Sequence, residues 1–440
     1  MAKPYLRCTV LLFLSLLGQQ SRGLAQAHAP KRWITAWGAS PENAATTPVS
    51  NATVRMIARV TAAGDAVRIR LDNTFGAAPL TIGQAYIGER VQGARVALGS
   101  SHKVTFQGSV RVIIPAGGRV ESDPVTMKVS SQQDLAVSMF IPETNVLPSQ
   151  HSRAQVTSYQ SQNNSGDLSA VEDPKPFTGT TTAMLWLRAI DVLTTSSSSL
   201  KGVVVAFGDS ITDGTCTTVD GHDRWEDWMA VRLDLARGIS GGVPKSAMPA
   251  STWAVINEGI GGNTISGGNF PAPPRSTPGV ERLDRDVFSH SSVTHVIVFM
   301  GTNDLRRGAS AAQVIAGMQD IIERAHKRRL KVFGVTVLPR QNRVPLTPAP
   351  ATPYPGGRWD ESMTGARHEV NRWIRTQAKF DAVIDFDEVV RDPANPELML
   401  PRFDCGDNVH PSPAGYYEMG RSVKLDLLQS PLRKAARGSR

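Results

Sequence analysis

The spacing of apolar residues changes near residue 200, and this change restricts the folds open to the chain. After Lys201, short apolar runs typical of strands buried on both faces are separated mostly by stretches with helical periodicity. Strands that alternate with helices require right-handed crossovers and therefore form a parallel sheet. We expect residues 201–430 to form a doubly wound parallel sheet in α/β/α layers. The predicted strands are Val203–Phe207, Trp253–Asn257, His295–Met300, Val332–Leu338 and Ala382–Phe386.

Residues 31–193 instead have the alternating pattern of antiparallel strands. Val67–Asp72 alternates apolar and polar side chains, which gives a strand one buried and one solvent-exposed face. Turn sequences rich in Gly and Pro separate several such runs, so we expect a β-sandwich-like domain, with a long polar loop over residues 145–173. The other predicted strands are Val54–Val60, Val110–Ile114, Val125–Val129 and Leu135–Ile141.

Four side chains in this β-rich region have two interpretations. Trp33, Trp37, His151 and Tyr159 could form a sugar-binding face. Packing in the core or between the domains is the more frequent role of such residues, and we favour it. The region contains no complete set of catalytic residues, so we expect the chemistry in the other half of the chain.

Four segments differ in composition from the two predicted domains, and the first of them is the N-terminus. Residues 1–27 are predicted to be a cleavable signal peptide, because Lys3 and Arg7 precede a short apolar run that is followed by Ala25 and Ala27. We therefore expect a secreted or periplasmic protein without stable membrane insertion, an uncleaved anchor being the alternative. The other three segments are a linker over residues 194–200, an inserted proline-rich loop over residues 339–357 and a basic tail over residues 431–440.

The net charge does not by itself indicate a partner. The chain has 48 Lys and Arg residues against 39 Asp and Glu residues, for a formal charge of +9. These basic residues are scattered and form no stripe with interleaved aromatic side chains, so nucleic-acid binding is not expected. We expect a monomer.

Three of the predicted buried strands end in turns that carry polar residues. The first ends in Gly208-Asp209-Ser210, the second continues into a turn with Gly262, and the third ends in Gly301-Thr302-Asn303. Because the carboxyl ends of parallel strands meet at one edge of a sheet, we expect these turns to lie side by side. Asp407 and His410 stand just ahead of the last predicted helix.

Serine, histidine and aspartate are the residues of an acyl-transfer triad. A serine hydroxyl is a weak nucleophile that needs an adjacent base, which predicts Ser210 as the nucleophile and His410 as the base. Asp407 would hold the imidazole in the required tautomer. The backbone N–H groups of Ser210 and Gly262 and the side-chain amide of Asn303 are the predicted oxyanion donors. Each residue alone could be a turn or capping residue, so the interpretation depends on their joint occurrence.

The segments that carry these residues, in this order along the chain, resemble the conserved sequence blocks of the SGNH (GDSL) hydrolases. The similar segments are Gly208-Asp209-Ser210-Ile211, with Ile where Leu is usual, the turn with Gly262, Gly301-x-Asn303-Asp304 and Asp407-x-x-His410. The resemblance covers residues 201–428 and implies that the four letters correspond to Ser210, Gly262, Asn303 and His410. Trp33–Ser40 also resembles exported members with a β-rich N-terminal domain. The longer gap after Ser210 and the proline-rich insertion depart from the family pattern and leave the shape of the substrate site open.

The resemblance implies a secreted serine esterase that hydrolyses carboxylic esters and needs no cofactor. For an exported member with a β-rich domain it suggests O-acetyl groups on carbohydrate, so the expected substrate is a small ester or an acetylated polysaccharide. A lipase, lysophospholipase or arylesterase is the alternative among enzymes. A non-catalytic carbohydrate-binding surface protein is the alternative from another class.

Three cysteines are present, Cys8, Cys216 and Cys405. Cys8 lies in the predicted signal peptide, and the other two have no metal-type spacing, so a metal site is not expected. If Ser210 and His410 meet in a triad, both cysteines are carried to the same edge of the sheet. Export would then favour a disulfide between Cys216 and Cys405, with two free buried thiols as the alternative.

Overall fold

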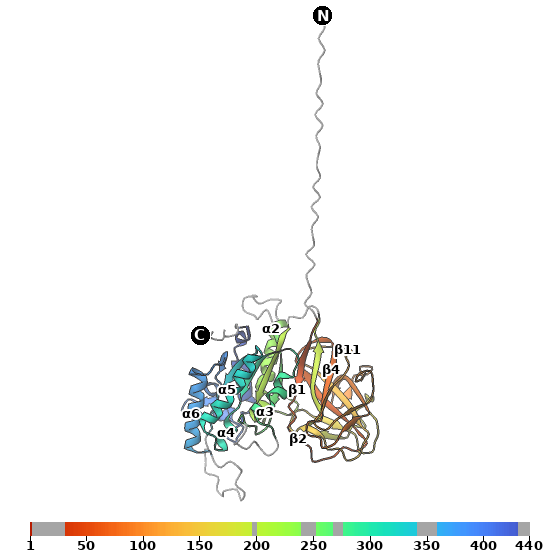
Figure 1. Cartoon of the computed structure of the whole chain (residues 1–440), viewed down its shortest axis with the longest axis horizontal. Coiled ribbons are helices and arrows are strands. Elements are labelled where there is room, and N and C mark those ends of the chain that lie inside the picture. Colours follow the sequence, from red (N-terminus) through yellow and green to blue (C-terminus); the bar gives the residue numbers. More distant parts are fainter. Residues whose placement is uncertain (2–30, 196–199, 239–251, 267–275, 341–358, 430–440) are drawn as a thin grey trace.

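The computed structural model describes residues 1, 31–195, 200–238, 252–266, 276–340 and 359–429. A β-rich N-terminal region lies beside a C-terminal α/β region (Figure 1). The predicted signal peptide beyond Met1, most of the linker, nearly all of the proline-rich insertion and the basic tail lie outside the described residues. Within the described part of the chain, no helix is both long and apolar enough to cross a membrane.

The β-rich region is built on two larger antiparallel sheets. In β4 (Gly64–Asp72), Val67, Ile69 and Leu71 are buried while Arg68 stays partly exposed, as the alternating pattern predicts. The first sheet joins β4 to β1 (Trp33–Gly38), β10 (Arg119–Glu121), β11 (Val125–Val129) and β17 (Leu187–Leu193). The second contains β3 (Ala52–Val60), β6 (Gln84–Gln92), β7 (Arg95–Val96), β8 (His102–Val104), β12 (Gln133–Ile141), β14 (Ser158–Gln160) and β15 (Gly179–Thr181).

The stretch 145–173 is mostly loop, as expected, but it contains two short strands that the prediction missed. β13 (Ser149–His151) pairs with β2 (Asn43–Ala44) and β16 (Met184–Leu185), and β14 pairs with β3 and β15. A three-residue strand is too short to show an alternating pattern, and backbone pairing with neighbours stabilises it instead. A further short pair consists of β5 (Leu80–Ile82) and β9 (Val112–Ile114).

The α/β region contains the predicted parallel sheet, in the order β19-β18-β20-β21-β22. In chain order this is 2-1-3-4-5, a doubly wound arrangement. Its switch point lies between β18 and β20, and open α/β sheets bind ligands at the carboxyl ends of the strands there. The strands are β18 (Leu200–Gly208), β19 (Thr252–Gly259), β20 (Val293–Phe299), β21 (Lys331–Val335) and β22 (Ala382–Ile384).

Helices cover both faces of this sheet. Val203 and Val205 of β18 belong to one buried cluster, together with α5 and α6, and Val204 and Ala206 belong to another, together with α2, α7 and α8. The expected three layers are therefore present. The helices are α1 (Ser210–Asp213), α2 (Trp225–Gly238), α3 (Gly279–Leu283), α4 (Thr302–Arg306), α5 (Ala311–Lys327), α6 (Glu361–Thr376), α7 (Phe386–Val390) and α8 (Pro413–Ser422). Minor elements are a π-helical turn (Asp284–Phe288), the hairpin of β23 (Arg391–Asp392) and β24 (Asn395–Met399), and 3₁₀ turns at Pro401–Phe403 and Leu425–Gln429.

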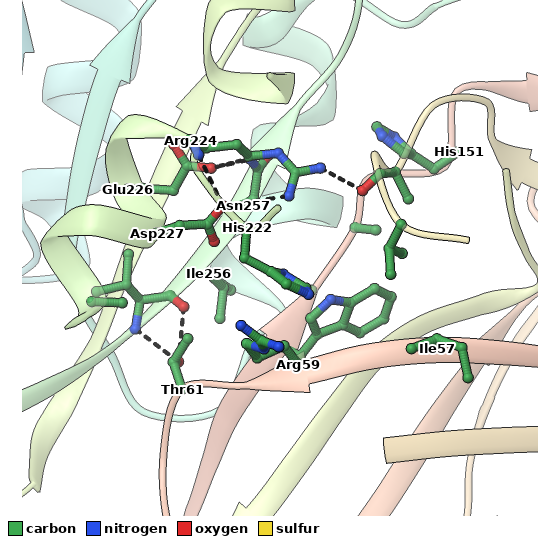
Figure 2. A pocket seen from close by; sticks show the side chains of 17 residues that line it. Ile57, Arg59, Thr61, His151, His222, Arg224, Glu226, Asp227, Ile256 and Asn257 are labelled. Carbon is green, nitrogen blue, oxygen red and sulfur yellow. Dashed lines mark hydrogen bonds and ion pairs between the residues drawn. The ribbon is translucent and has the colours of Figure 1, made fainter. Parts of the chain in front are cut away.

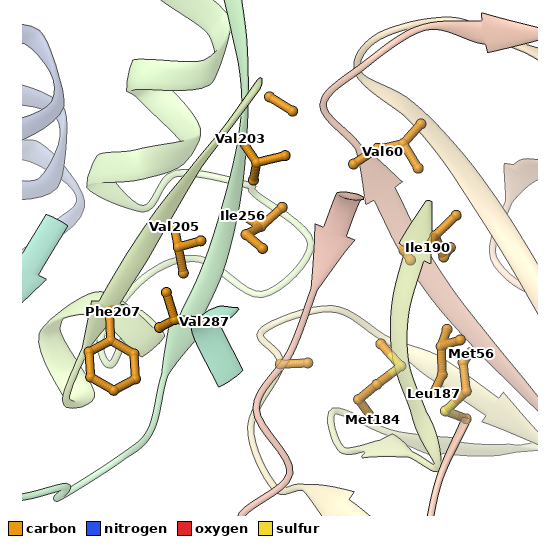
Figure 3. Close-up of a cluster of buried hydrophobic side chains, with 14 of the residues drawn as sticks. Met56, Val60, Met184, Leu187, Ile190, Val203, Val205, Phe207, Ile256 and Val287 are labelled. Atoms are coloured by element: carbon orange, nitrogen blue, oxygen red, sulfur yellow. The ribbon is translucent and has the colours of Figure 1, made fainter. Parts of the chain in front are cut away.

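The two regions share a hydrophobic core. A single cluster of buried side chains runs from the parallel sheet into the β-rich region. Figure 3 shows Val203, Val205 and Ile256 on the side of the parallel sheet, with Val60 and Ile190 on the side of the β-rich region. Apolar surface buried in this way holds the regions together, so their contact extends far beyond the predicted linker.

Candidate active site

Ser210 begins a one-turn helix at the carboxyl end of the first parallel strand. Gly208, the last residue of β18, lies opposite Gly259 of β19 and Phe299 of β20, so the three strands end at the same level. Asp209 caps α1, because its side-chain oxygen Oδ1 accepts a hydrogen bond of 3.0 Å from the backbone N–H of Ile211. Ser210 itself is 7% exposed.

The side chains of Ser210, His410 and Asp407 form a continuous row. His410 Nε2 lies 2.8 Å from Ser210 Oγ, and His410 Nδ1 lies 2.5 Å from Asp407 Oδ2. A carboxylate only accepts hydrogen bonds, so Nδ1 carries the proton and Nε2 can accept from the serine hydroxyl. The structure thus brings Ser210 into contact with His410, which lies 200 positions later in the chain, and His410 into contact with Asp407, which lies 3 positions before it.

The loop ahead of α8 presents Asp407 and His410 together. Asp407 Oδ1 accepts the backbone N–H groups of Val409 and His410, at 2.9 and 2.8 Å. Burial alone raises the pKa of Asp407, but the hydrogen bonds and charge of His410 outweigh burial and lower that pKa to about 2. Asp407 is therefore ionised at neutral pH and can hold the imidazole in one orientation.

The turns after the two neighbouring strands flank Ser210. Gly262 lies in the turn after β19 with a φ of +72°, a conformation that favours glycine. Asn303 is buried in the first turn of α4, just after β20, and its Nδ2 donates to the carbonyl oxygen of Asn263 at 3.1 Å. A side-chain amide has a second N–H group. Both predicted donors therefore stand at the sheet edge where Ser210 lies.

Two buried carboxylates support these turns. Asp304 accepts the backbone N–H groups of Ile265 and Ser266 at 3.0 Å each, which joins the turn after β19 to α4. Burial raises the pKa of Asp209 to about 7 and that of Asp304 to about 6. Both side chains bind backbone N–H groups, which fits a role in holding the turns in place.

A disulfide joins Cys216 and Cys405, which confirms the predicted pairing. Their Cα atoms are 6.3 Å apart, within the usual range for disulfides. Cys216 follows the turn that carries Ser210, and Cys405 precedes His410, so the bridge joins the two loops that meet at the site. A hydrogen bond of 2.7 Å from the Tyr416 hydroxyl to the Thr215 carbonyl oxygen adds a second connection.

One group among the described residues has the composition of a metal site. Cys216, Asp407 and His410 place possible ligand atoms within 4.8 Å of one another. The sulfur of Cys216 is bonded to Cys405, however, and the other two side chains are hydrogen-bonded to each other. In the oxidised protein this group therefore does not offer a complete set of ligands.

The β-rich region supports the site through contacts that sequence patterns did not reveal. His151 of β13 is 5% exposed, and its Nε2 lies 2.9 Å from Oδ1 of Asp213, the last residue of α1. Ser40 Oγ lies 2.5 Å from Oε2 of Glu258 at the end of β19 and accepts a hydrogen bond from Arg282 at 2.9 Å. His151 therefore packs between the two regions, which is the role that the sequence analysis favoured over a sugar-binding face.

Arg340 is a further residue near the site that the sequence did not single out. Its side chain is buried, and its Nη1 donates to Thr302 Oγ1 at 3.2 Å. Burial lowers the pKa of Arg340 to about 10, and the carboxylates of Asp407 and Asp209 act in the opposite direction. Arg340 lies at the border of the proline-rich insertion, where no periodic pattern could have identified it.

The contact between His151 and Asp213 predicts a loss of stability at alkaline pH. Burial alone lowers the pKa of His151, but the Asp213 carboxylate, with Glu42 nearby, outweighs burial and raises the pKa to about 9. Because the folded-state pKa is higher than the unfolded value of 6.5, this contribution is complete below pH 6.5 and is lost as the pH rises through about 9. The shift corresponds to about 3 kcal/mol in the free energy of unfolding.

Urea unfolding of the wild type and of His151→Gln at about pH 6 and about pH 9.5 measures this contribution. The free energy of unfolding should fall more steeply with pH in the wild type than in the variant. Equal falls in both proteins would contradict the prediction.

Comparison with known proteins identifies the family of the α/β region. Residues 206–417 match the model of the GDSL-like lipase/acylhydrolase family. Residues 206–417 therefore form a GDSL-like lipase/acylhydrolase domain, which confirms the resemblance inferred from the sequence segments. No curated protein matches the chain.

Solved structures that are similar to the chain cover about half of it. A lipolytic protein of the G-D-S-L family from Desulfitobacterium hafniense is 19% identical, with a TM-score of 0.35, and the match covers 50% of this chain and 96% of that chain. Est24, a carbohydrate acetylesterase from Sinorhizobium meliloti, is 20% identical, with a TM-score of 0.35 and coverages of 50% and 95%. An aryl esterase from M. smegmatis is also 20% identical, with a TM-score of 0.35, and the match covers 50% of this chain and 95% of that chain.

Proposed function

We propose that the protein hydrolyses carboxylic esters with Ser210 as nucleophile, His410 as general base and Asp407 as the residue that orients the imidazole. The observation that carries the proposal is the row of contacts at 2.8 Å and 2.5 Å that joins these three side chains at the switch point of the sheet. Membership of residues 206–417 in a lipase/acylhydrolase family supports the same class of reaction.

The geometry supports a two-step reaction. As Ser210 Oγ attacks the ester carbonyl carbon, His410 Nε2 accepts the hydroxyl proton and the carbonyl oxygen becomes an anion. The bond to the alcohol oxygen then breaks, and His410 returns the proton to that oxygen. Water attacks the acyl-serine in the same way, transferring a proton to His410, which then protonates Ser210 as the carboxylic acid leaves. Asp407 stays ionised throughout and stabilises the imidazolium.

We propose that the oxyanion is bound by the N–H groups of Ser210 and Gly262 and by the Asn303 side-chain amide. These groups stand at the ends of three neighbouring strands, and the buried Asp304 helps to hold two of the turns. Fixed donors of this kind cost no reorganisation when charge develops, and for that reason they stabilise the transition state.

Replacing Asn303 with alanine tests this assignment. The variant should lose about 10²- to 10³-fold in kcat, because one donor to the developing charge is removed, while KM should change little. Steady-state kinetics with p-nitrophenyl acetate measure both constants. A folded variant in which KM rises and kcat stays within about twofold would place Asn303 in substrate binding instead.

The proposed natural substrate is an O-acetylated carbohydrate outside the cell, hydrolysed by a monomeric enzyme. The resemblance of Trp33–Ser40 to exported members supports this choice, and the Cys216–Cys405 disulfide fits an oxidising compartment. Acetate release from acetylated polysaccharides and a p-nitrophenyl ester series of increasing acyl length should both show a preference for acetyl. A preference for long acyl chains would favour a lipase, and cleavage of aryl but not sugar esters an arylesterase.

The reaction itself is tested by turnover together with covalent labelling. The oxidised wild type should release p-nitrophenol from p-nitrophenyl acetate, and a fluorophosphonate should modify Ser210 alone, as mapped by peptide mass spectrometry. Heat-denatured protein is the control for non-specific labelling. Folded protein that shows neither turnover nor labelling would favour the non-catalytic carbohydrate-binding alternative.

A further inference from the structure

The helix that carries the proposed nucleophile is only one turn long, so its two ends move together. Ser210 is its first residue and Asp213 its last. The N–H of Gly214 closes the turn on the Ser210 carbonyl oxygen at 3.0 Å. The side chain of Asp213 is almost fully buried. Any force on the Asp213 carboxylate is therefore transmitted to Ser210 through four residues of helical backbone.

The partner of that carboxylate comes from the β-rich region. His151 Nδ1 lies 2.9 Å from the carbonyl oxygen of Ser40, and His151 Nε2 lies 2.9 Å from Asp213 Oδ1. Both neighbouring atoms are acceptors, so both ring nitrogens donate and the imidazole is positively charged. Glu42 is a second acidic neighbour of this ring. The contact is thus a buried ion pair across the boundary of the two regions.

Arg224 provides a second connection at the same place. Its Nε donates to the Asp213 carbonyl oxygen at 2.7 Å, and its Nη2 donates to the Ala154 carbonyl oxygen, three residues beyond His151. Figure 2 shows His151 and Arg224 along one edge of the pocket between the regions. Asp213 is therefore held through its side chain by His151 of β13, and through its backbone by Arg224, which also contacts the segment just after β13.

We propose that His151 is a positioning residue for the nucleophile: its ion pair with Asp213 holds α1 so that Ser210 Oγ stays within hydrogen-bonding distance of His410. The inference rests on the proposed function and extends it, because it makes part of the β-rich region necessary for the chemistry of the other region. Without the imidazolium, the buried Asp213 carboxylate would lose the cation that is hydrogen-bonded to it, which favours movement of the carboxylate or uptake of a proton.

The expected consequence is a loss in kcat. A misplacement of about 1 Å in the reacting groups can cost about 100-fold in rate. His151→Gln keeps a donor of similar shape but has no charge, and it should lower kcat about 10- to 100-fold with KM within about twofold of wild type. In the double variant His151→Gln/Asp213→Asn the pair is neutral on both sides, so kcat should recover in part.

His326→Gln is the matched control. His326 Nε2 also lies 2.9 Å from a carboxylate oxygen, that of Asp381, but this pair stands at the end of α5, near the start of β21 and away from Ser210. This variant should keep the wild-type kcat. Circular dichroism and thermal unfolding of every variant separate misplacement from unfolding, and the nearly isosteric double variant gives a second reading if His151→Gln is poorly folded.

The kinetic outcomes distinguish the inference from the function on which it rests. Turnover that is lost in His151→Gln at constant KM and partly restored in the double variant supports positioning. Folded His151→Gln with wild-type kcat, or a double variant that shows the summed loss of the two single variants, overturns the positioning role. Equal turnover in the wild type and Ser210→Ala would instead overturn the proposed function itself.

Discussion

Exchange of Ser210 for alanine is expected to lower kcat for ester hydrolysis by about 10⁴-fold or more while the protein stays folded. The change removes the oxygen that lies 2.8 Å from His410 Nε2, so no acyl-enzyme can form. Ser210 is the first residue of α1, where alanine is well tolerated, so the unfolding temperature should stay close to that of the wild type. Initial rates with p-nitrophenyl acetate and thermal unfolding measure the two effects.

His410→Ala should cause a loss of similar size, and the double variant Ser210→Ala/His410→Ala should be no slower than either single variant. Residues that act as a unit in one step do not have additive effects. Asp407→Asn should be less severe, because it disturbs the imidazole without removing it. A folded Ser210→Ala enzyme that retains more than about a tenth of the wild-type kcat would overturn the assignment of the nucleophile.

Loss of the Cys216–Cys405 disulfide has the second largest expected effect. The bridge joins residues 189 positions apart, and loop-closure entropy for such a span stabilises the folded state by up to about 5 kcal/mol. The double variant Cys216→Ser/Cys405→Ser should therefore unfold at a lower denaturant concentration. Because the bridge joins the loop after Ser210 to the loop before His410, kcat should fall as well.

Reduction of the wild type provides the internal control for this prediction. A thiol reductant should shift the unfolding midpoint of the wild type to that of the double variant, whereas the double variant should not respond. Two alkylatable thiols in the unreduced wild type, or equal midpoints in wild type and variant, would show that the bridge does not contribute.

The parallel sheet was predictable because strands buried on both faces need apolar residues at every position. Val203–Phe207 has that composition, and the polar turns that follow such strands stand out by contrast. The short strands β13 and β14 were not predictable, since pairing with neighbours holds them in place rather than their own side chains. One partner of each strand, β2 for β13 and β3 for β14, lies about a hundred residues away in the chain.

At the site, the sequence led to the residues with distinctive chemistry, and the structure brings Ser210, His410 and Asp407 into contact. Their catalytic roles remain predictions until the variants are measured. The sequence favoured packing for His151, but its partner could not be predicted, because no pattern around a histidine identifies the residue that it contacts. Its contact with Asp213 spans 62 positions and exists only once both regions have folded.

The core shared by the two regions has a practical consequence for anyone who shortens the chain for expression. A cut between β17 and β18 would leave Val203, Val205 and Ile256 facing water on one fragment and Val60 and Ile190 on the other. Such fragments would tend to aggregate. Residues 31–429 should therefore be expressed as one piece. This piece should show one cooperative melting transition rather than two.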